Sequence, residues 1–223
     1  MDFQKHTSKK LVALFNNKPF QGQSPEKARV IFLSSDANYS PEISNNTFFE
    51  KILEYQKDGV VFWNKYDCHH PFLHPSYPFN KNMAGVPFHR NFSKIGLTSE
   101  HAEHVSFVEL LDSPTVGNKS QNKNLFYQLV SQPHLEYIEN LMTGGGDKLF
   151  FVSNGVLRDI EKIKKTHPVF GWLNFKSGQS EQYSKEINGN KIQEIYHFSS
   201  SQIHGQIDDI SAAIDSWLKK VQG

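Results

Sequence analysis

The chain has 223 residues, enough for one well-buried domain and short for two, and its 24 basic and 23 acidic side chains give a formal net charge of +1. This balance neither predicts nor excludes nucleic-acid binding, because any basic surface must be local. The single cysteine, Cys68, excludes an intrachain disulfide and a thiolate-held iron–sulfur cluster. The polar N-terminal residues and the lack of a membrane-length apolar run predict a cytoplasmic protein without membrane contacts, and we expect a monomer.

Predicted strands and helices alternate along the chain. Strands are expected over 29–33, 104–111, 148–152 and 191–197, with further extended segments over 169–175 and 185–197. Helices are expected over 2–17, 47–55 (ended by Gly59), 85–96, 124–130, 134–142, 155–165 and 206–221, and 18–27 is expected to be a loop. This order predicts one domain over residues 1–223, a three-layer α/β/α sandwich with a mostly parallel central sheet.

An aromatic and histidine-rich insertion is expected at about residues 60–85. Its prolines, as in HHPFLHPSYP, disfavour any long regular element, so we predict an ordered irregular segment. Trp63, Tyr66 and Phe72 are many large aromatic residues for a free loop and favour a lid over a binding cleft. The insertion also contains four possible metal ligands, which leave a metal-dependent hydrolase as one alternative: Cys68, His69, His70 and His74.

Three predicted strands end in polar turns: SSDAN (34–38), DSPTVGN (112–118) and HFSSS (197–201). The carboxyl ends of parallel strands meet at one edge of a sheet, which is where ligands bind in open α/β folds. Asp36 and His197 are therefore expected to face one cleft, from the ends of neighbouring strands. Together with the surrounding hydroxyl and amide groups, they suit a phosphate or sugar-phosphate ligand.

The ordered motifs resemble the uracil-DNA glycosylase superfamily over roughly residues 28–222. Ser34-Ser35-Asp36-Ala37-Asn38 matches its first motif, and His197-Phe198-Ser199-Ser200-Ser201 matches its last. Between them, Gly85-Val86-Pro87-Phe88 and Ile95-Gly96-Leu97 resemble segments of the superfamily's iron–sulfur branch, followed by a strand and loop, FVELLDSPTVGN. The resemblance implies an enzyme that flips a base out of DNA and hydrolyses its N-glycosidic bond, with water as nucleophile and neither a metal nor an organic cofactor.

The resemblance also implies roles for individual residues. Asp36 would activate the attacking water, and His197 would hydrogen-bond the departing base. Phe88 would stack on that base, with Asn38 and Glu109 also expected in base binding. Phosphates of the DNA or nucleotide would be held by hydroxyl and amide groups of seven residues: Ser34, Ser35, Ser113, Thr115, Ser199, Ser200 and Ser201.

Several residues depart from the superfamily pattern. Glu109 stands where the superfamily reads uracil with asparagine, and an ionised carboxylate there would disfavour uracil, so a base other than uracil is expected. The usual wedge position holds Ser201-Gln202, both prolines of the last motif are absent, and so are the cluster-binding cysteines. The lost wedge leaves open a second alternative, a non-catalytic module that binds a nucleotide or a single strand.

Overall fold

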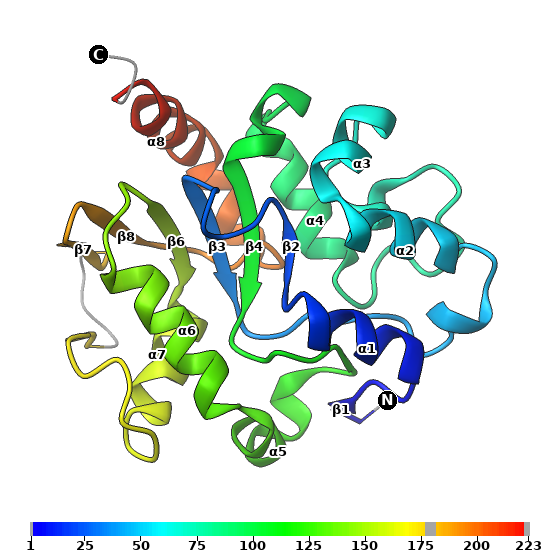
Figure 1. The fold of residues 1–223 in the computed structure, drawn as a ribbon, viewed down its shortest axis with the longest axis horizontal. Coiled ribbons are helices and arrows are strands. Elements are labelled where there is room, and N and C mark those ends of the chain that lie inside the picture. The colour runs from blue at the N-terminus through cyan, green and yellow to red at the C-terminus, as the bar shows by residue number, and fades with distance from the viewer. Residues whose placement is uncertain (1, 177–181, 221–223) are drawn as a thin grey trace.

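The computed structural model describes residues 2–176 and 182–220, in which an α/β fold is built around a mixed, mostly parallel six-stranded sheet (Figure 1). The strand order is β2 (Phe20–Gly22), β4 (Val105–Glu109), β3 (Val30–Ser34), β6 (Leu149–Ser153), β8 (Asn190–Ile195) and β7 (Ser184–Ile187). The inner strands β4, β3, β6 and β8 are parallel, whereas β2 and β7 run antiparallel at the two edges. A separate antiparallel pair joins β1 (Gln4–Lys5) to β5 (Thr115–Val116).

The central strand β3 is buried on both faces, as its continuous apolar sequence predicts. Ile31 and Leu33 belong to one core cluster, which also contains residues of α6 (Gln132–Thr143) and α7 (Asn154–Ile163). Val30 and Phe32 belong to a second cluster, with residues of α3 (Gly59–Tyr66), α4 (Val86–Phe92) and α8 (Ile207–Lys219). Alternate side chains of one strand therefore hold helices on opposite faces of the sheet.

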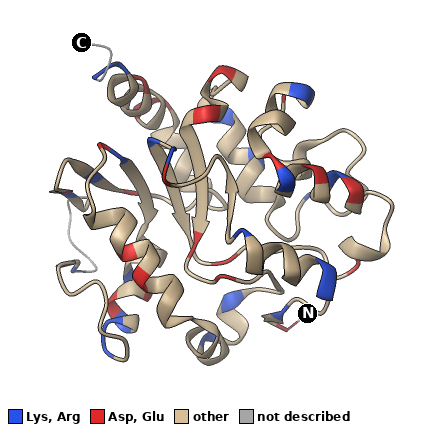
Figure 2. Ribbon diagram, in the orientation of Figure 1, with Lys and Arg blue, Asp and Glu red and all other residues tan. Residues whose placement is uncertain are grey.

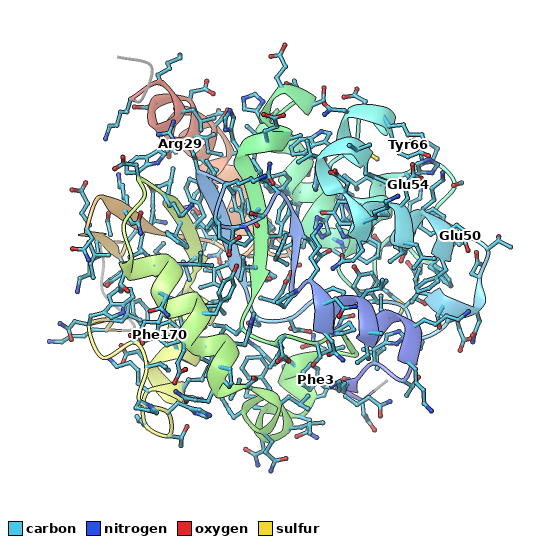
Figure 3. The ribbon with its side chains drawn as sticks, viewed as in Figure 1. Phe3, Arg29, Glu50, Glu54, Tyr66 and Phe170 are labelled. Atoms are coloured by element: carbon cyan, nitrogen blue, oxygen red, sulfur yellow. The ribbon has the colours of Figure 1, made fainter. Side chains whose placement is uncertain are left out.

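The remaining helices lie beside the sheet, toward the β2 edge or below the strand ends in Figure 1: α1 (Lys9–Asn17), α2 (Phe49–Lys57) and α5 (Lys123–Leu129). Arg29, labelled in Figure 3, lies just before β3 and donates hydrogen bonds to the carbonyls of Trp217 and Leu218 at the end of α8, both at 3.0 Å. These carbonyls lack partners within a helix, so the guanidinium group stabilises the end of α8.

Gly59 begins a helix instead of ending one, so the prediction of an irregular insertion from residue 60 is wrong in its first part. The Asp58 carboxylate caps α3 by accepting from the amides of Val60 and Val61 at 3.0 and 2.9 Å. A Cβ atom on Gly59 would lie 2.7 Å from the Cα atom of Gly22 in β2. Glycine at position 59 therefore allows α3 to approach the edge strand closely. In the sequence alone, a glycine required by this tertiary contact looks the same as a glycine that ends a helix.

Three other segments differ from the sequence prediction. Residues 4–5 form β1, and Ser8 caps α1, so that helix begins at Lys9 and not at residue 2. Residues 169–175 form a partly buried turn and irregular segment in place of a strand, and β2 arises within the expected loop over 18–27. The expected extended segment over 185–197 is a hairpin, because Asn188 and Gly189 have φ angles of 49° and 85° and reverse the chain.

The charged residues are interspersed over the elements that Figure 2 shows, with no separation of basic from acidic helices across the sheet. Glu54 and Tyr66, labelled in Figure 3, exemplify local pairing: the Tyr66 hydroxyl donates to the Glu54 carboxylate at 2.9 Å between α2 and α3. In the described part of the chain, none of the helices combines the length and apolar character needed to cross a membrane.

Candidate functional site at the carboxyl edge of the sheet

Asp36 lies just beyond the end of β3 and is fixed by the loop that follows β4. The Thr115 hydroxyl donates to its carboxylate, while the Thr115 amide donates to the carbonyl of Ala37 at 2.9 Å. The side-chain amide of Asn38 donates to the Gly117 carbonyl, which joins the same two segments. Burial raises the pKa of Asp36, and the Thr115 hydroxyl and the charge of Lys119 act in the opposite direction. The half-buried carboxylate is thus held in one orientation.

Lys119 supplies a positive charge beside Asp36. Its ammonium group pairs with the carboxylate of Asp159 and donates to the Ser35 hydroxyl at 2.7 Å. The hydroxyl of Tyr127 donates to the other oxygen of Asp159 at 2.9 Å. Because Ser35, just after β3, and Asp159 in α7 hold the ammonium group of Lys119, its positive charge has a fixed position in the site.

His197 lies two residues beyond the end of β8, at the surface. The Ser199 amide donates to its Nδ1 atom at 3.1 Å, so a neutral ring carries its proton on Nε2. Desolvation by neighbouring protein groups lowers the pKa of His197 to about 4, and the charge of Lys119 adds to that shift. The ring is therefore neutral at pH 7 and offers an Nε2–H donor.

Phe88, in the first turns of α4, packs its ring edge-on against His197, with 5.6 Å between the ring centroids. The two residues line a cavity of ≈ 10 Å³, to which the end of β6 contributes Ser153. That volume suits about one water molecule. A nucleobase could enter only if Phe88 turned away from His197.

Asp36 and His197 both lie at the carboxyl edge, but they do not follow neighbouring strands, since β6 lies between β3 and β8. Ser153 at the end of β6 occupies that intermediate position. The positive charge of Lys119 interacts electrostatically with both groups and lowers the pKa of Asp36 and of His197. Ser153 and Lys119 were not predicted from the sequence, because neither lies in one of the three polar turns that were singled out at the strand ends.

Glu109, at the end of β4, is enclosed behind the site, with 4 % of its surface exposed. Its Oε1 atom accepts from the Gln21 side chain at 2.9 Å, while its Oε2 atom has no hydrogen-bond partner among the described residues. Burial raises the pKa of Glu109 to about 8, and the nearby charge of Asp36 contributes. The raised pKa favours the protonated side chain at pH 7, so the selection against uracil, which requires an ionised carboxylate, stays a prediction.

Gln21 links Glu109 to the histidines of the insertion. Its Oε1 atom accepts from His70 Nε2 at 2.8 Å and from the Tyr39 hydroxyl at 3.2 Å. The His70 ring stacks on His89 at 3.7 Å between centroids, and His89 in turn shares a hydrogen bond of 3.1 Å with His69. Burial lowers the pKa of all three histidines, that of His69 to about 3. They form a buried, neutral network.

The residues proposed as metal ligands do not converge. His69 and His70 are engaged in the buried network, and His74 bonds to Ser76 at 2.7 Å. Cys68 is partly exposed, and burial raises the pKa of its thiol to about 11. Over residues 2–176 and 182–220 there is no group of three or more histidine, cysteine or acidic side chains that could hold a metal ion.

The three aromatic residues expected to form a lid over the cleft do not lie together on one surface. Trp63 and Phe72 are buried in two different core clusters, and Tyr66 bonds to Glu54 on the outer side of α2 and α3. The aromatic residues of the insertion therefore serve packing.

The expected phosphate-binding residues divide into three groups. Ser35, Ser113 and Thr115 are buried, and the hydroxyls of Ser35 and Thr115 already bond to Asp159 and Asp36. Ser34 and Ser200 are partly exposed, with the Ser200 hydroxyl capping a short 3-10 helix through the Gln202 amide. Ser199 and Ser201 are exposed beside His197 and could reach a bound anion directly.

Comparison of the chain with protein-family models, with curated proteins and with solved structures found no match.

Proposed function

We propose that the protein is a base N-glycosylase with a three-layer fold of the uracil-DNA glycosylase type, acting on DNA or a nucleotide. The observation that supports this best is the joint placement of Asp36, Lys119 and His197 at the carboxyl edge of the sheet, with Phe88 against His197. Helices packed on both faces of a sheet with four parallel inner strands are consistent with the proposed fold.

The residues at this edge suit the two halves of a hydrolytic reaction. Asp36 accepts a proton from water as the water oxygen bonds to the sugar carbon. The bond from that carbon to the base nitrogen breaks, and its electron pair leaves with the base. The Nε2–H group of neutral His197 donates to the base oxygen on which negative charge grows. Phe88 provides an apolar ring for the base once it has turned away from His197.

The glycosylase is tested with single- and double-stranded oligonucleotides that each carry one modified base, including uracil, hypoxanthine and xanthine. Products are scored as abasic sites by strand cleavage in alkali. We expect release of at least one base, reduced about a hundredfold or more in Asp36→Asn and in His197→Ala. The matched controls Asp208→Asn, at an exposed position of α8, and His167→Ala should retain wild-type rates. Release that is unchanged in Asp36→Asn would contradict the assignment.

One alternative is a module that binds nucleotides or single strands without cleaving them, which the polar residues Ser201 and Gln202 at the usual wedge position favour. The same oligonucleotides distinguish the two functions. Binding that depends on the exposed residues Ser199 and Ser201, together with no abasic product from any base in the panel, would support binding alone.

A further inference from the structure

Two segments that contain neither aspartate nor glutamate, residues 68–99 and 195–207, meet where the rings of Phe88 and His197 touch. The chain has 23 acidic side chains in 223 residues, so segments of this combined length would hold about five on average. The same segments contain three exposed cations: Lys81, Arg90 and Lys94. In the described structure none of the three forms an ion pair with an acidic side chain. A surface of this kind attracts anions.

Contacts from α4 and from the short 3-10 helix that follows it, Ser93–Ile95, join the two segments. The side-chain amide of Asn91 donates to the Phe198 carbonyl at 2.5 Å. The Nε2 atom of His204 lies 3.2 Å from the side-chain oxygen of Asn91 and 3.0 Å from the ammonium group of Lys94. Lys94 therefore lies beside the segment that follows His197.

The loop before α4 is held by Arg90. Its Nη1 atom donates to the side chain of Asn82 at 3.0 Å and to the Lys81 carbonyl at 3.3 Å. The Nε and Nη2 groups of Arg90 have no hydrogen-bond partner in the described structure and can donate to a bound anion. Met83 belongs to the same loop, and 59 % of its surface is exposed. The loop thus presents an apolar side chain next to two cations.

This surface adjoins the candidate active site through both the loop and α4. The amide of Gly85, at the end of the loop, donates to the carbonyl of Asn38 at 3.0 Å, two residues beyond Asp36. Phe88, in α4, packs against His197. An anionic chain that lies over the three cations would therefore pass next to the site. Bases of nucleic acids offer apolar faces that an exposed methionine can contact.

We infer that this surface, formed by Lys81, Met83, Arg90 and Lys94, binds the sugar-phosphate backbone and bases of a polynucleotide strand next to the target base. The three cations pair with phosphates, and Met83 contacts a neighbouring base. The inference rests on the proposed function for the kind of ligand, and it selects a strand over a free nucleotide. Arg90 and Lys94 are held by different neighbours, the loop and His204, so a ligand with a single phosphate would leave part of the surface unused.

The surface is tested with a fluorescein-labelled single-stranded oligonucleotide of unmodified bases, titrated with the full chain and followed by fluorescence anisotropy. We expect saturable binding that weakens as salt rises from about 50 to 200 mM. A variant that combines Lys81→Gln, Arg90→Gln and Lys94→Gln should bind about tenfold more weakly at the lower salt concentration. Its slope of log affinity against log salt should be smaller by about two, because each phosphate contact on a single strand contributes about 0.7.

Matched variants make the result specific to these residues. Lys81→Arg combined with Lys94→Arg keeps both charges and should bind as the wild type does. Met83→Ala should weaken binding a few fold with an unchanged salt slope, since it removes apolar contact and no charge. A second triple variant removes three exposed lysines of α1 and α2 and should also bind as the wild type does: Lys9→Gln, Lys10→Gln and Lys57→Gln. Circular dichroism of each variant confirms that it is folded.

The outcomes separate this surface from the proposed activity. Strand binding that depends on the three cations, with no base released from any modified oligonucleotide, would uphold the surface and contradict the glycosylase. Base release by the wild type, with wild-type strand affinity in the triple variant of Lys81, Arg90 and Lys94, would overturn the surface alone. Competition by deoxyuridine monophosphate as strong as that by unlabelled strand would also overturn it, as would tighter binding to phosphatidylserine vesicles than to the oligonucleotide.

Discussion

Glu109 combines a buried carboxyl group with an oxygen that has no hydrogen-bond partner in the described structure. Its pKa of about 8 in the folded protein exceeds the ordinary value of 4.5. Between these values the unfolded chain releases a proton that the folded protein retains, so this group makes the protein less stable as the pH rises through that range. Glu109→Gln cannot ionise. We expect the free energy of unfolding of Glu109→Gln, relative to that of the wild type, to be about 3 kcal/mol higher at pH 8 than at pH 5.

Urea denaturation at both pH values measures this difference. Glu100→Gln removes an exposed carboxyl group and should give curves parallel to those of the wild type. A constant difference between Glu109→Gln and the wild type at pH 5 and pH 8 would show that Glu109 ionises normally.

Thr115 tests whether Asp36 acts as the base. The Thr115 hydroxyl donates to the carboxylate and lowers its pKa, so Thr115→Val should raise the pKa of Asp36. The acidic limb of the pH profile of base release should then move upward by about one unit. Thr115→Ser keeps the hydroxyl and should restore the wild-type profile, whereas Thr166→Val, at an exposed position, serves as the control. An unshifted profile in Thr115→Val would separate Asp36 from proton transfer.

Single residues at strand ends were the most predictable part of the site. Asp36 and His197 follow strands whose apolar sequences define their ends, so their placement at one edge of the sheet needs no knowledge of tertiary contacts. Lys119 and Gln21 could not be found in this way, because each acts through a partner 40 or more residues away: Asp159 for Lys119, and His70 and Glu109 for Gln21. The protonation of Glu109 likewise depends on burial and not on local sequence.

At the scale of elements, the contact between α3 and β2 depends on Gly59 and Gly22. Alanine usually favours a helix over glycine by up to about 1 kcal/mol, but a Cβ atom at position 59 would lie 2.7 Å from the Gly22 backbone. We expect Gly59→Ala to lower the free energy of unfolding by about 2 kcal/mol, since backbone must move to accept the methyl group. Thermal and urea denaturation measure the loss.

Gly155→Ala is the matched control, because a Cβ atom there, in the first turn of α7, would meet the Ser153 hydroxyl at an ordinary 3.8 Å. It should be neutral or stabilising. Equal stabilities of Gly59→Ala and Gly155→Ala would show that α3 and β2 are not closely packed in solution.

The elements that the sequence predicts well are those with strong local signals. β3 and β6 are continuous apolar runs up to a final serine, β4 is apolar except for Ser106 and Glu109, and α6, α7 and α8 have apolar faces of helical period. β2 has three residues and exists because β4 offers an unpaired edge, which no local pattern records. The hairpin of β7 and β8 did carry a local signal, Asn188-Gly189, which is a typical two-residue turn.

At the scale of the whole molecule, buried titratable groups set the dependence of stability on pH. His69, His70 and His89 stay neutral in the folded protein well below the ordinary pKa of 6.5, so unfolding takes up protons as the pH falls below that value. Each histidine that takes up a proton only on unfolding lowers the free energy of unfolding by up to about 1.4 kcal/mol for each pH unit below its ordinary pKa. Glu109 acts in the opposite direction between its ordinary pKa and about 8.

We therefore expect the free energy of unfolding to be greatest near pH 6.5, with a steep decline toward pH 5 and a shallower one toward pH 8. Urea denaturation at half-unit intervals of pH measures the curve. Stability that rises steadily from pH 6 to pH 8, or that is flat from pH 5 to pH 6.5, would contradict the neutral buried network.

Cys68 precedes this network directly in the chain and gives it a chemical reporter. A thiol with a pKa of about 11, against an ordinary value of 9.0, has about a hundredfold less thiolate at neutral pH. Because Cys68 is the only cysteine, a thiol reagent can modify no other cysteine of the chain. The rate of that modification therefore reports how accessible and how ionised this partly exposed thiol is beside His69 and His70, without any label having to be engineered into the protein.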